Sequence, residues 1–300
     1  MPSAERAGQF SSIAEQISRI LGVSFALTRA QRAGGGCINE AWILSGTQGR
    51  FFVKINASDR REMFEAELDG LHALARAGAV RVPQPVCVGS DGLSSWLVVE
   101  YIEFARHRDA ADWRRLGTLL AAQHRRLGER FGWRRDNTIG STPQPNRWNT
   151  DWVEFLREQR LGHQLGLAAR NGYASALAER GARLLESLPA FFGGHRPQPS
   201  LLHGDLWSGN VAFTPAGEPV VFDPAVYYGD READLAMTEL FGGFAAPFYS
   251  AYREAWPLDA GYELRRRLYN LYHLLNHLNL FGPAYLDQCR AGIDWLLAQA

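Results

Sequence analysis

The sequence predicts an α+β fold of two lobes: an N-terminal antiparallel sheet with one inserted helix, and a C-terminal lobe that is mainly helical. Short β-prone runs separated by glycines fill the first hundred residues, whereas helical periodicity dominates afterwards. The chain has 300 residues, of which 46% are hydrophobic. This length is more than one compact domain usually holds. We therefore expect an N-terminal lobe over residues 1–102 and a C-terminal lobe over residues 103–300.

The N-terminal lobe is expected to open with a helix that carries Ile13, Ile17 and Leu21 on one face and ends at Gly22. Glycine-rich turns separate the β-prone runs that follow, and this pattern predicts an antiparallel meander. The runs cover residues 25–27, 41–44, 51–55 and 96–102. Helical spacing over residues 60–76 predicts a helix inserted before the last run.

The C-terminal lobe is expected to be built from amphipathic helices around a strand-like stretch at residues 200–222. The helical segments cover residues 112–127, 150–169, 174–188, 232–240, 263–280 and 283–297. Residues 131–149 have no period and are rich in Gly, Pro, Asn and Thr. This segment is longer than an ordinary connection, and such loops are often functional.

Charge and cysteine content exclude several classes of protein. The 32 basic residues balance 32 acidic ones, so no overall field attracts nucleic acid or an anionic membrane. No uncharged apolar run approaches the roughly 18 residues of a membrane span, and the start of the chain does not resemble a signal peptide. Cys37, Cys87 and Cys289 are too widely spaced for a disulfide framework or a zinc ribbon. A reducing cytoplasm fits these features best.

Three oxygen-bearing side chains are expected to meet near the middle of the C-terminal lobe. An apolar strand, a polar hairpin and a second apolar strand bring Asp205, Asn210 and Asp223 together at the opening of one site. Asn210 and Asp223 suit Mg²⁺, which prefers oxygen ligands, and Asp205 can accept a hydroxyl proton. The set predicts phosphoryl transfer. An ordinary polar hairpin would explain one aspartate and the asparagine, but not their placement against two apolar strands.

Lys54 lies inside the apolar run 51–55, where a half-buried cation needs a partner. Glu67 falls on the apolar stripe of the following helix, whereas Glu65 and Asp69 fall outside it. We expect Lys54 and Glu67 to form an ion pair that positions the lysine on donor phosphates. The glycines at 34–36 either cradle those phosphates or form a plain turn, and the lysine favours the cradle.

These parts together resemble the protein-kinase-like superfamily, in which a catalytic loop of the type H-x-D-x-x-x-x-N precedes a metal-binding aspartate. Residues 203–210 match that loop, and Asp223 takes the position of the metal-binding aspartate. The match is closest to the fructosamine kinases, also called ketosamine 3-kinases, and extends over nearly the whole chain. The matching segments are residues 35–41, 52–54, 131–132, 136–140, 152–155, 159–161, 203–210 and 223–232.

The resemblance implies transfer of the γ-phosphate of ATP to the 3-hydroxyl of a ketosamine, either a fructosamine or a ribulosamine. The resulting 3-phosphate decomposes and frees the amine, so the activity is a deglycation repair. The resemblance leaves open whether the ketosamine is small or protein-bound, and whether the enzyme is a monomer or a homodimer.

Residue roles follow from the same resemblance. Asp205 is the expected catalytic base, while Asn210 and Asp223 hold Mg²⁺. Nucleotide contacts are expected from Gly35, Gly36, Asn39, Lys54 held by Glu67, and the backbone at Glu100 and Ile102. Apart from the resemblance, Trp207 either contacts the acceptor or packs as core, and Asp230 and Glu232 either face the amine of the acceptor or are solvated surface carboxylates. Cys37 is either a small turn residue or an oxidisable thiol that regulates activity.

Two alternatives stay open at this stage. Another small-molecule kinase, acting on an aminoglycoside, choline or a homoserine-like hydroxyl, would carry similar machinery, and a panel of acceptors distinguishes it. A nucleotide-binding module without turnover would lack one of the essential groups. His203, Asp234 and His124 are expected to be structural, and His273 with His277 to be packed on a helix rather than to bind metal.

Overall fold

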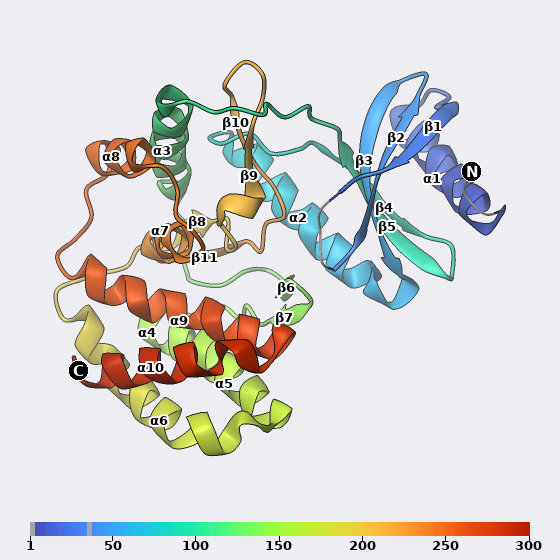
Figure 1. Cartoon of the computed structure of the whole chain (residues 1–300). Helices are drawn as coiled ribbons and strands as arrows, with labels where there is room; N and C mark the ends of the chain where they lie inside the picture. The colour runs from blue at the N-terminus through green and yellow to red at the C-terminus, as the bar shows by residue number, and fades with distance from the viewer. Residues whose placement is uncertain (1–3, 35–37) are drawn as a thin grey trace.

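The computed structural model describes residues 4–34 and 38–300 and confirms the two-lobed α+β architecture (Figure 1). The N-terminal lobe contains a five-stranded antiparallel sheet in the order β1-β2-β3-β5-β4. Its elements are α1 (Ala4–Leu21), β1 (Leu27–Arg32), β2 (Glu40–Gly46), β3 (Gly49–Ala57), α2 (Arg61–Ala77), β4 (Pro85–Ser90) and β5 (Ser94–Glu100). The meander β1-β2-β3 and the inserted helix α2 are those predicted from the sequence.

The two faces of this sheet are covered by different partners. Val53 and Val98 face α1 and pack with Phe10, Ile13 and other residues in a cluster confined to this lobe. The neighbours of Val98 in β5 point the other way, because side chains alternate along a strand. Leu97 and Val99 therefore join α2 and the C-terminal lobe in the larger core. The second face thus ties the sheet to the rest of the molecule.

The C-terminal lobe is mainly helical, with short two-stranded ribbons that carry the site (Figure 1). Its helices are α3 (Ala110–His124), α4 (Trp152–Leu156), α5 (Gly162–Ala168), α6 (Ala174–Ser187), α7 (Arg231–Leu240), α8 (Ala246–Ala255), α9 (Tyr262–Phe281) and α10 (Leu286–Leu297). Its strands are β6 (Asn137–Ile139), β7 (Thr142–Gln144), β8 (Ser200–Leu202), β9 (Val211–Phe213), β10 (Pro219–Val221) and β11 (Tyr227–Gly229). Among the described helices, none is both long enough and apolar enough to span a membrane.

Several elements differ from the expectation. The first strand begins at Leu27 rather than at residue 25, and Phe25 instead packs in the core from the preceding loop. The helix expected over 150–169 is divided by a π-helical turn at Arg157–Leu161. The sequence pattern does not predict β4, α8 or β11. Prolines lie at the starts of β4 and α8, and β11 has only three residues, so none of them shows enough periodicity to detect.

The contact between α3 and α8 depends on a glycine. A Cβ atom at Gly117 would lie 2.3 Å from the carbonyl oxygen of Phe248, which belongs to the backbone of α8. Gly166 in α5 has no such neighbour, since the nearest atom to its Cβ position is the flexible end of Arg170 at 3.6 Å.

We predict that Gly117→Ala separates these helices and lowers the free energy of unfolding by about 1 to 3 kcal/mol, the usual cost of overpacking. Gly166→Ala is the control, because alanine is the better helix former and should leave the melting temperature unchanged or raise it. Calorimetric melting of both variants checks this. Equal melting temperatures for the two variants would contradict the close packing.

Candidate active site

Lys54 joins three segments of the chain. Its Nζ atom donates hydrogen bonds to Glu67 Oε1 on α2 and to Asp223 Oδ1 in the loop before β11, each at 2.6 Å. Burial disfavours a charged ammonium, but Asp223 and Glu67 outweigh this effect and raise the pKa of Lys54. The predicted pair between Lys54 and Glu67 is therefore present, and Asp223 completes a triad that links β3 and α2 to the C-terminal lobe.

Asp223 adopts an unusual backbone conformation. It is the one non-glycine residue of the described chain with positive φ, at 58°, a region that costs energy for an L-residue. The catalytic loop fixes the chain around it. The Phe222 amide donates to Asn210 O at 3.1 Å, and the Ala225 amide donates to His203 O at 2.8 Å. Such strain persists only where the surroundings hold it, and it is frequent at active sites.

Asp205 and Asn210 lie side by side, as the sequence predicts. Asn210 Nδ2 donates to Asp205 Oδ2 at 3.1 Å and to its backbone carbonyl at 2.8 Å. Burial, reinforced by the negative charge of Asp223, raises the pKa of Asp205 from 3.8 to about 7. A carboxyl group with this pKa can exchange a proton with a substrate hydroxyl near neutral pH.

Buried polar residues support the catalytic loop from below. Both oxygens of Asp234 accept hydrogen bonds from the loop backbone, from the amides of His203 at 2.7 Å and Gly204 at 2.8 Å. His124 contacts the same carboxylate at 3.2 Å, and the His203 ring hydrogen-bonds Phe222 O at 3.0 Å. These contacts confirm the structural roles expected for His203, Asp234 and His124.

Gly204 is required by the geometry of the loop. Its φ is +85°, and a Cβ atom there would lie 2.0 Å from the carbonyl oxygen of Ala225. Glycine alone allows the catalytic loop to approach the segment after Asp223 this closely.

Asp230 and Glu232 lie elsewhere than predicted. Their exposed fractions are 1% and 0%, and both carboxylates already have partners. Asp230 accepts from Tyr269 at 2.5 Å and contacts His195 at 2.7 Å, while Arg265 donates to both oxygens of Glu232. The expectation that these two residues face an acceptor amine is therefore corrected: they cap and anchor the start of α7. The ligand atoms of His195, Asp230 and Glu232 lie close enough together to hold a metal ion, but hydrogen bonds within the described chain already occupy them.

Trp207 lies on the catalytic loop with 37% of its surface exposed, so it is not a core residue. One edge contacts Phe241, with the ring centroids 6.3 Å apart, and the indole lies over Gly209, where a Cβ atom would be 2.3 Å from the ring. The remaining surface is free to contact a ligand beside Asp205.

The other expected nucleotide contacts are only partly described. Asn39 Oδ1 accepts a hydrogen bond of 2.7 Å from Asn56, which holds it against β3. Within the described chain, the Ile102 amide has no hydrogen-bond partner, whereas the Glu100 amide donates to Gln84 O. Gly35, Gly36 and Cys37 lie outside the described residues.

Two residues that the sequence pattern does not reveal hold together the segments around the site. Asp69 was placed outside the apolar stripe of α2, yet it is buried, and it accepts hydrogen bonds from Trp133 and Arg134 of the other lobe. Arg81 donates at 2.6 Å both to Glu100, at the end of β5, and to Glu218, in the turn between β9 and β10. Both contacts join distant segments, and helical periodicity or strand alternation contains no signal for them.

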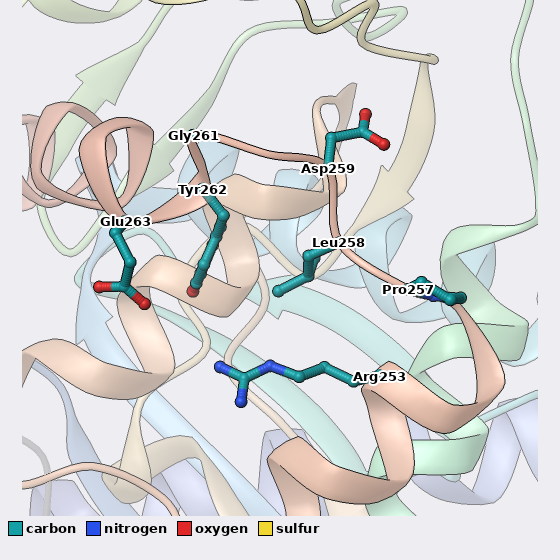
Figure 2. A pocket seen from close by; sticks show the side chains of 7 residues that line it. All are labelled: Arg253, Pro257, Leu258, Asp259, Gly261, Tyr262 and Glu263. Atoms are coloured by element: carbon teal, nitrogen blue, oxygen red, sulfur yellow. The ribbon is translucent and has the colours of Figure 1, made fainter.

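A surface hollow lies apart from this site. It lies between the end of α8 and the start of α9 and has a volume of about 440 Å³. Figure 2 shows the residues that line it, which are Arg253, Pro257, Leu258, Asp259, Gly261, Tyr262 and Glu263. Although Asp259 lines this hollow, its carboxylate contacts the His195 ring at 2.6 Å. None of the groups around Lys54 or Asp205 contributes to this hollow.

The two-lobed fold and the polar groups gathered around Lys54 and Asp205 are those of a kinase-like protein. Residues 9–299 match the family model described as fructosamine kinase. The chain belongs to the fructosamine kinase family.

Relatives and solved structures agree with this assignment. The "Probable ketoamine kinase" of Synechocystis sp. is 47% identical, with 94% of each chain covered. The chloroplastic protein-ribulosamine 3-kinase of Arabidopsis thaliana is 44% identical over 91% of this chain and 84% of its own. The crystal structure of a candidate fructosamine-3-kinase from Haemophilus somnus superposes with a TM-score of 0.89 at 30% identity, covering 96% of this chain and 97% of that one.

The raised pKa of Asp205 predicts a pH-dependent effect of Asp205→Asn on stability. Between 3.8 and about 7, the unfolded chain has released this proton while the folded chain still holds it. Raising the pH through this window therefore lowers the free energy of unfolding of the parent protein. Asparagine does not titrate, so the variant should gain melting temperature over the parent, more at about pH 8 than at about pH 5, while losing turnover.

Thermal melts of the nucleotide-free protein at both pH values test this. Asp287→Asn, at an exposed carboxylate, is the matched control and should show no such pH-dependent gain. The same gain for Asp205→Asn at both pH values would show that the buried carboxyl group does not titrate as described.

Proposed function

We propose that this protein phosphorylates the 3-hydroxyl of a ketosamine with ATP as the donor and Mg²⁺ as the metal. The observation that carries the proposal is the meeting of Lys54, Glu67 and Asp223 beside Asp205 and Asn210, in a chain of the fructosamine kinase family. The relatives' names specify a ketoamine or a protein-bound ribulosamine as their acceptor. The proposed activity releases amines from glycation products, as the resemblance implies.

The residues near Asp223 fit a magnesium ion. Asn210 uses its amide nitrogen to bind Asp205, and no hydrogen bond within the described chain occupies its Oδ1 atom. Asp223 gives Oδ1 to Lys54, and 45% of its side-chain surface is exposed, which leaves Oδ2 accessible. Two protein oxygens of this kind suit Mg²⁺, which typically takes its other ligands from phosphates and waters. Bound there, Mg²⁺ would neutralise charge on the donor phosphates.

The remaining groups have separate tasks. Lys54, fixed by Glu67, binds donor phosphates as a permanent cation. Asp205 orients the acceptor hydroxyl and receives its proton, since its raised pKa makes it a competent base near neutral pH. Phosphoryl transfer depends mainly on positioning and charge neutralisation, so no covalent intermediate with the protein is needed. The amide of Ile102 is available for the adenine ring.

Trp207 is the proposed acceptor platform. Sugars present apolar C–H faces that stack on aromatic rings, and the protonated amine of a ketosamine is attracted to the same π-surface. The exposed indole two residues after Asp205 offers such a surface next to the reacting hydroxyl.

Measuring ADP release with a panel of acceptors tests the function. We expect turnover with synthetic fructosamine and ribulosamine derivatives, free and peptide-linked, and none with kanamycin or choline. Mass spectrometry of the product should show one added phosphate. Turnover of kanamycin or choline without turnover of any ketosamine would reassign the acceptor class, and nucleotide binding without any turnover would contradict the proposal.

Trp207→Ala should lower kcat/KM for the ketosamine by about 5- to 30-fold, which corresponds to a loss of roughly 1 to 2 kcal/mol. ATP affinity and melting temperature should hardly change, because the ring is exposed. Trp148→Ala is the matched control, since Trp148 is similarly exposed at 40% but lies outside the catalytic loop. Steady-state kinetics of both variants checks this. A destabilised Trp207→Ala protein with normal acceptor kinetics would rule out stacking.

A further inference from the structure

The hairpin β6–β7 contributes two buried amide side chains to the segment that follows Asp223. Asn137 Nδ2 donates to Val226 O at 2.8 Å, and Gln144 Nε2 donates to Ala225 O at 3.1 Å. The exposed fractions of these two side chains are 7% and 1%. The hairpin belongs to the long segment 131–149, whose length and composition are typical of a functional loop. The catalytic roles described above do not use it.

The backbone at Asp223 needs support on both sides because its positive φ is unfavourable. On the N-terminal side, Asn210 O and the His203 ring hold the Phe222 amide and carbonyl. On the C-terminal side, the side chains that hold the Ala225 and Val226 carbonyls are Gln144 and Asn137 of the hairpin. The hairpin therefore completes the restraint on this segment.

The two amides are themselves fixed by a buried network. Gln144 Nε2 also donates to Asn137 Oδ1 at 2.8 Å, and Tyr272 OH on α9 donates to Gln144 Oε1 at 2.6 Å. Asn146 Nδ2 donates to Asn137 Oδ1 at 2.9 Å. Every polar atom of the Asn137 and Gln144 amide groups thus has a partner, so their orientations are determined.

Arg160 anchors the network from the π-helical turn at Arg157–Leu161. Its guanidinium donates to Asn146 Oδ1 at 2.7 Å and to Pro145 O at 2.6 Å, and it lies 4.0 Å from the ring centroid of Tyr227. The side chain is 1% exposed, and no carboxylate of the described chain pairs with it. Burying an unpaired charge is costly, so its contribution lies in strong, directional hydrogen bonds.

The tip of the hairpin is confined as well. A Cβ atom at Gly140 would lie 3.0 Å from Leu280 Cδ1 at the end of α9 and 3.1 Å from Ile38 Cδ1 on the N-terminal lobe. The hairpin is thus held at its base by Arg160, and its tip lies next to both α9 and the N-terminal lobe.

We propose that the β6–β7 hairpin is a fixed brace that keeps Asp223 in its metal-binding conformation, and that Asn137 and Gln144 are positioning residues for the phosphoryl transfer. The inference rests on the proposed role of Asp223 as a magnesium ligand. The two side chains of the brace that contact the Asp223 segment are buried, and each polar atom of their amide groups has a partner. Residues that hydrogen-bond to metal ligands and orient them typically contribute about 10- to 100-fold to metal affinity or activity.

The test compares the Kd of ADP with and without Mg²⁺, measured by calorimetry on the full chain. The parent protein should bind ADP more tightly with Mg²⁺. Gln144→Met keeps the volume but removes the amide donors, and Asn137→Ala removes the donor to Val226. Each should reduce the advantage given by Mg²⁺ by about tenfold, with a parallel fall in kcat. The Kd without Mg²⁺ and the acceptor KM should stay within about twofold of the parent values.

A further variant makes the outcome decisive. Gln16→Met is the matched control, because the Gln16 amide likewise donates to a backbone carbonyl, that of Val88, and accepts from an aromatic side chain, that of Trp96. It belongs to the N-terminal lobe and hydrogen-bonds neither the hairpin nor the Asp223 segment. The variant should keep the Mg²⁺ advantage even if its melting temperature falls. If Gln144→Met does not give a cooperative thermal transition, the test rests on Asn137→Ala, which removes a smaller side chain together with the donor to Val226.

The failures are distinguishable. If Asp223→Ala abolishes the Mg²⁺ advantage while the folded Gln144 and Asn137 variants keep it, the brace is wrong and the proposed function stands. If Asp223→Ala keeps the advantage, the proposed metal role fails and the brace fails with it. A loss in Gln16→Met as large as in the hairpin variants would also overturn the brace, because the effect would then be general destabilisation.

Discussion

The buried ammonium of Lys54 is the interaction on which the rest of the site depends. It lies between two carboxylates from different lobes, Glu67 on α2 and Asp223 in the loop before β11. Leaving one member of a buried ion pair without its partner typically costs about 3 to 5 kcal/mol. The position of the sheet, the orientation of α2 and the conformation of the segment at Asp223 are therefore coupled through one charged group.

The site could be predicted from sequence where a residue type conflicts with its local pattern. Lys54 stands out as a cation in an apolar strand, and Glu67 as the acid on the apolar face of a helix, so each points to the other. The catalytic loop has a specific motif and was located on the same grounds. Asp230 and Glu232 gave no such signal, because their burial is created by His195 and Arg265, which are distant in the sequence. The boundary between the lobes near residue 102 stays a prediction, since one large core contains residues from both sides of it.

Buried polar residues define the C-terminal lobe more than its helical periodicity does. Asp234 holds the catalytic loop, and Arg160 with Asn146 holds the β6–β7 hairpin. Sequence patterns predict which helices exist, but the contacts that orient them here are hydrogen bonds between segments far apart in the chain. Such contacts require each donor to meet a particular acceptor, so they specify one arrangement of loops where apolar packing would tolerate several.

The electrostatics of the site are dominated by carboxylates that face one another. The negative charge of Asp223 adds to burial in raising the pKa of Asp205, and Asp234 acts in the same direction from below. Donor phosphates bring further negative charge, and Lys54 already shares its single charge between two carboxylates. A second cation at Asp223 would relieve this repulsion, lower the pKa of Asp205 and return it to its basic form. The folded protein therefore holds several carboxylates close together at a cost in stability. A ligand that brings positive charge would reduce this cost. Groups that serve activity often lower the stability of an enzyme in this way.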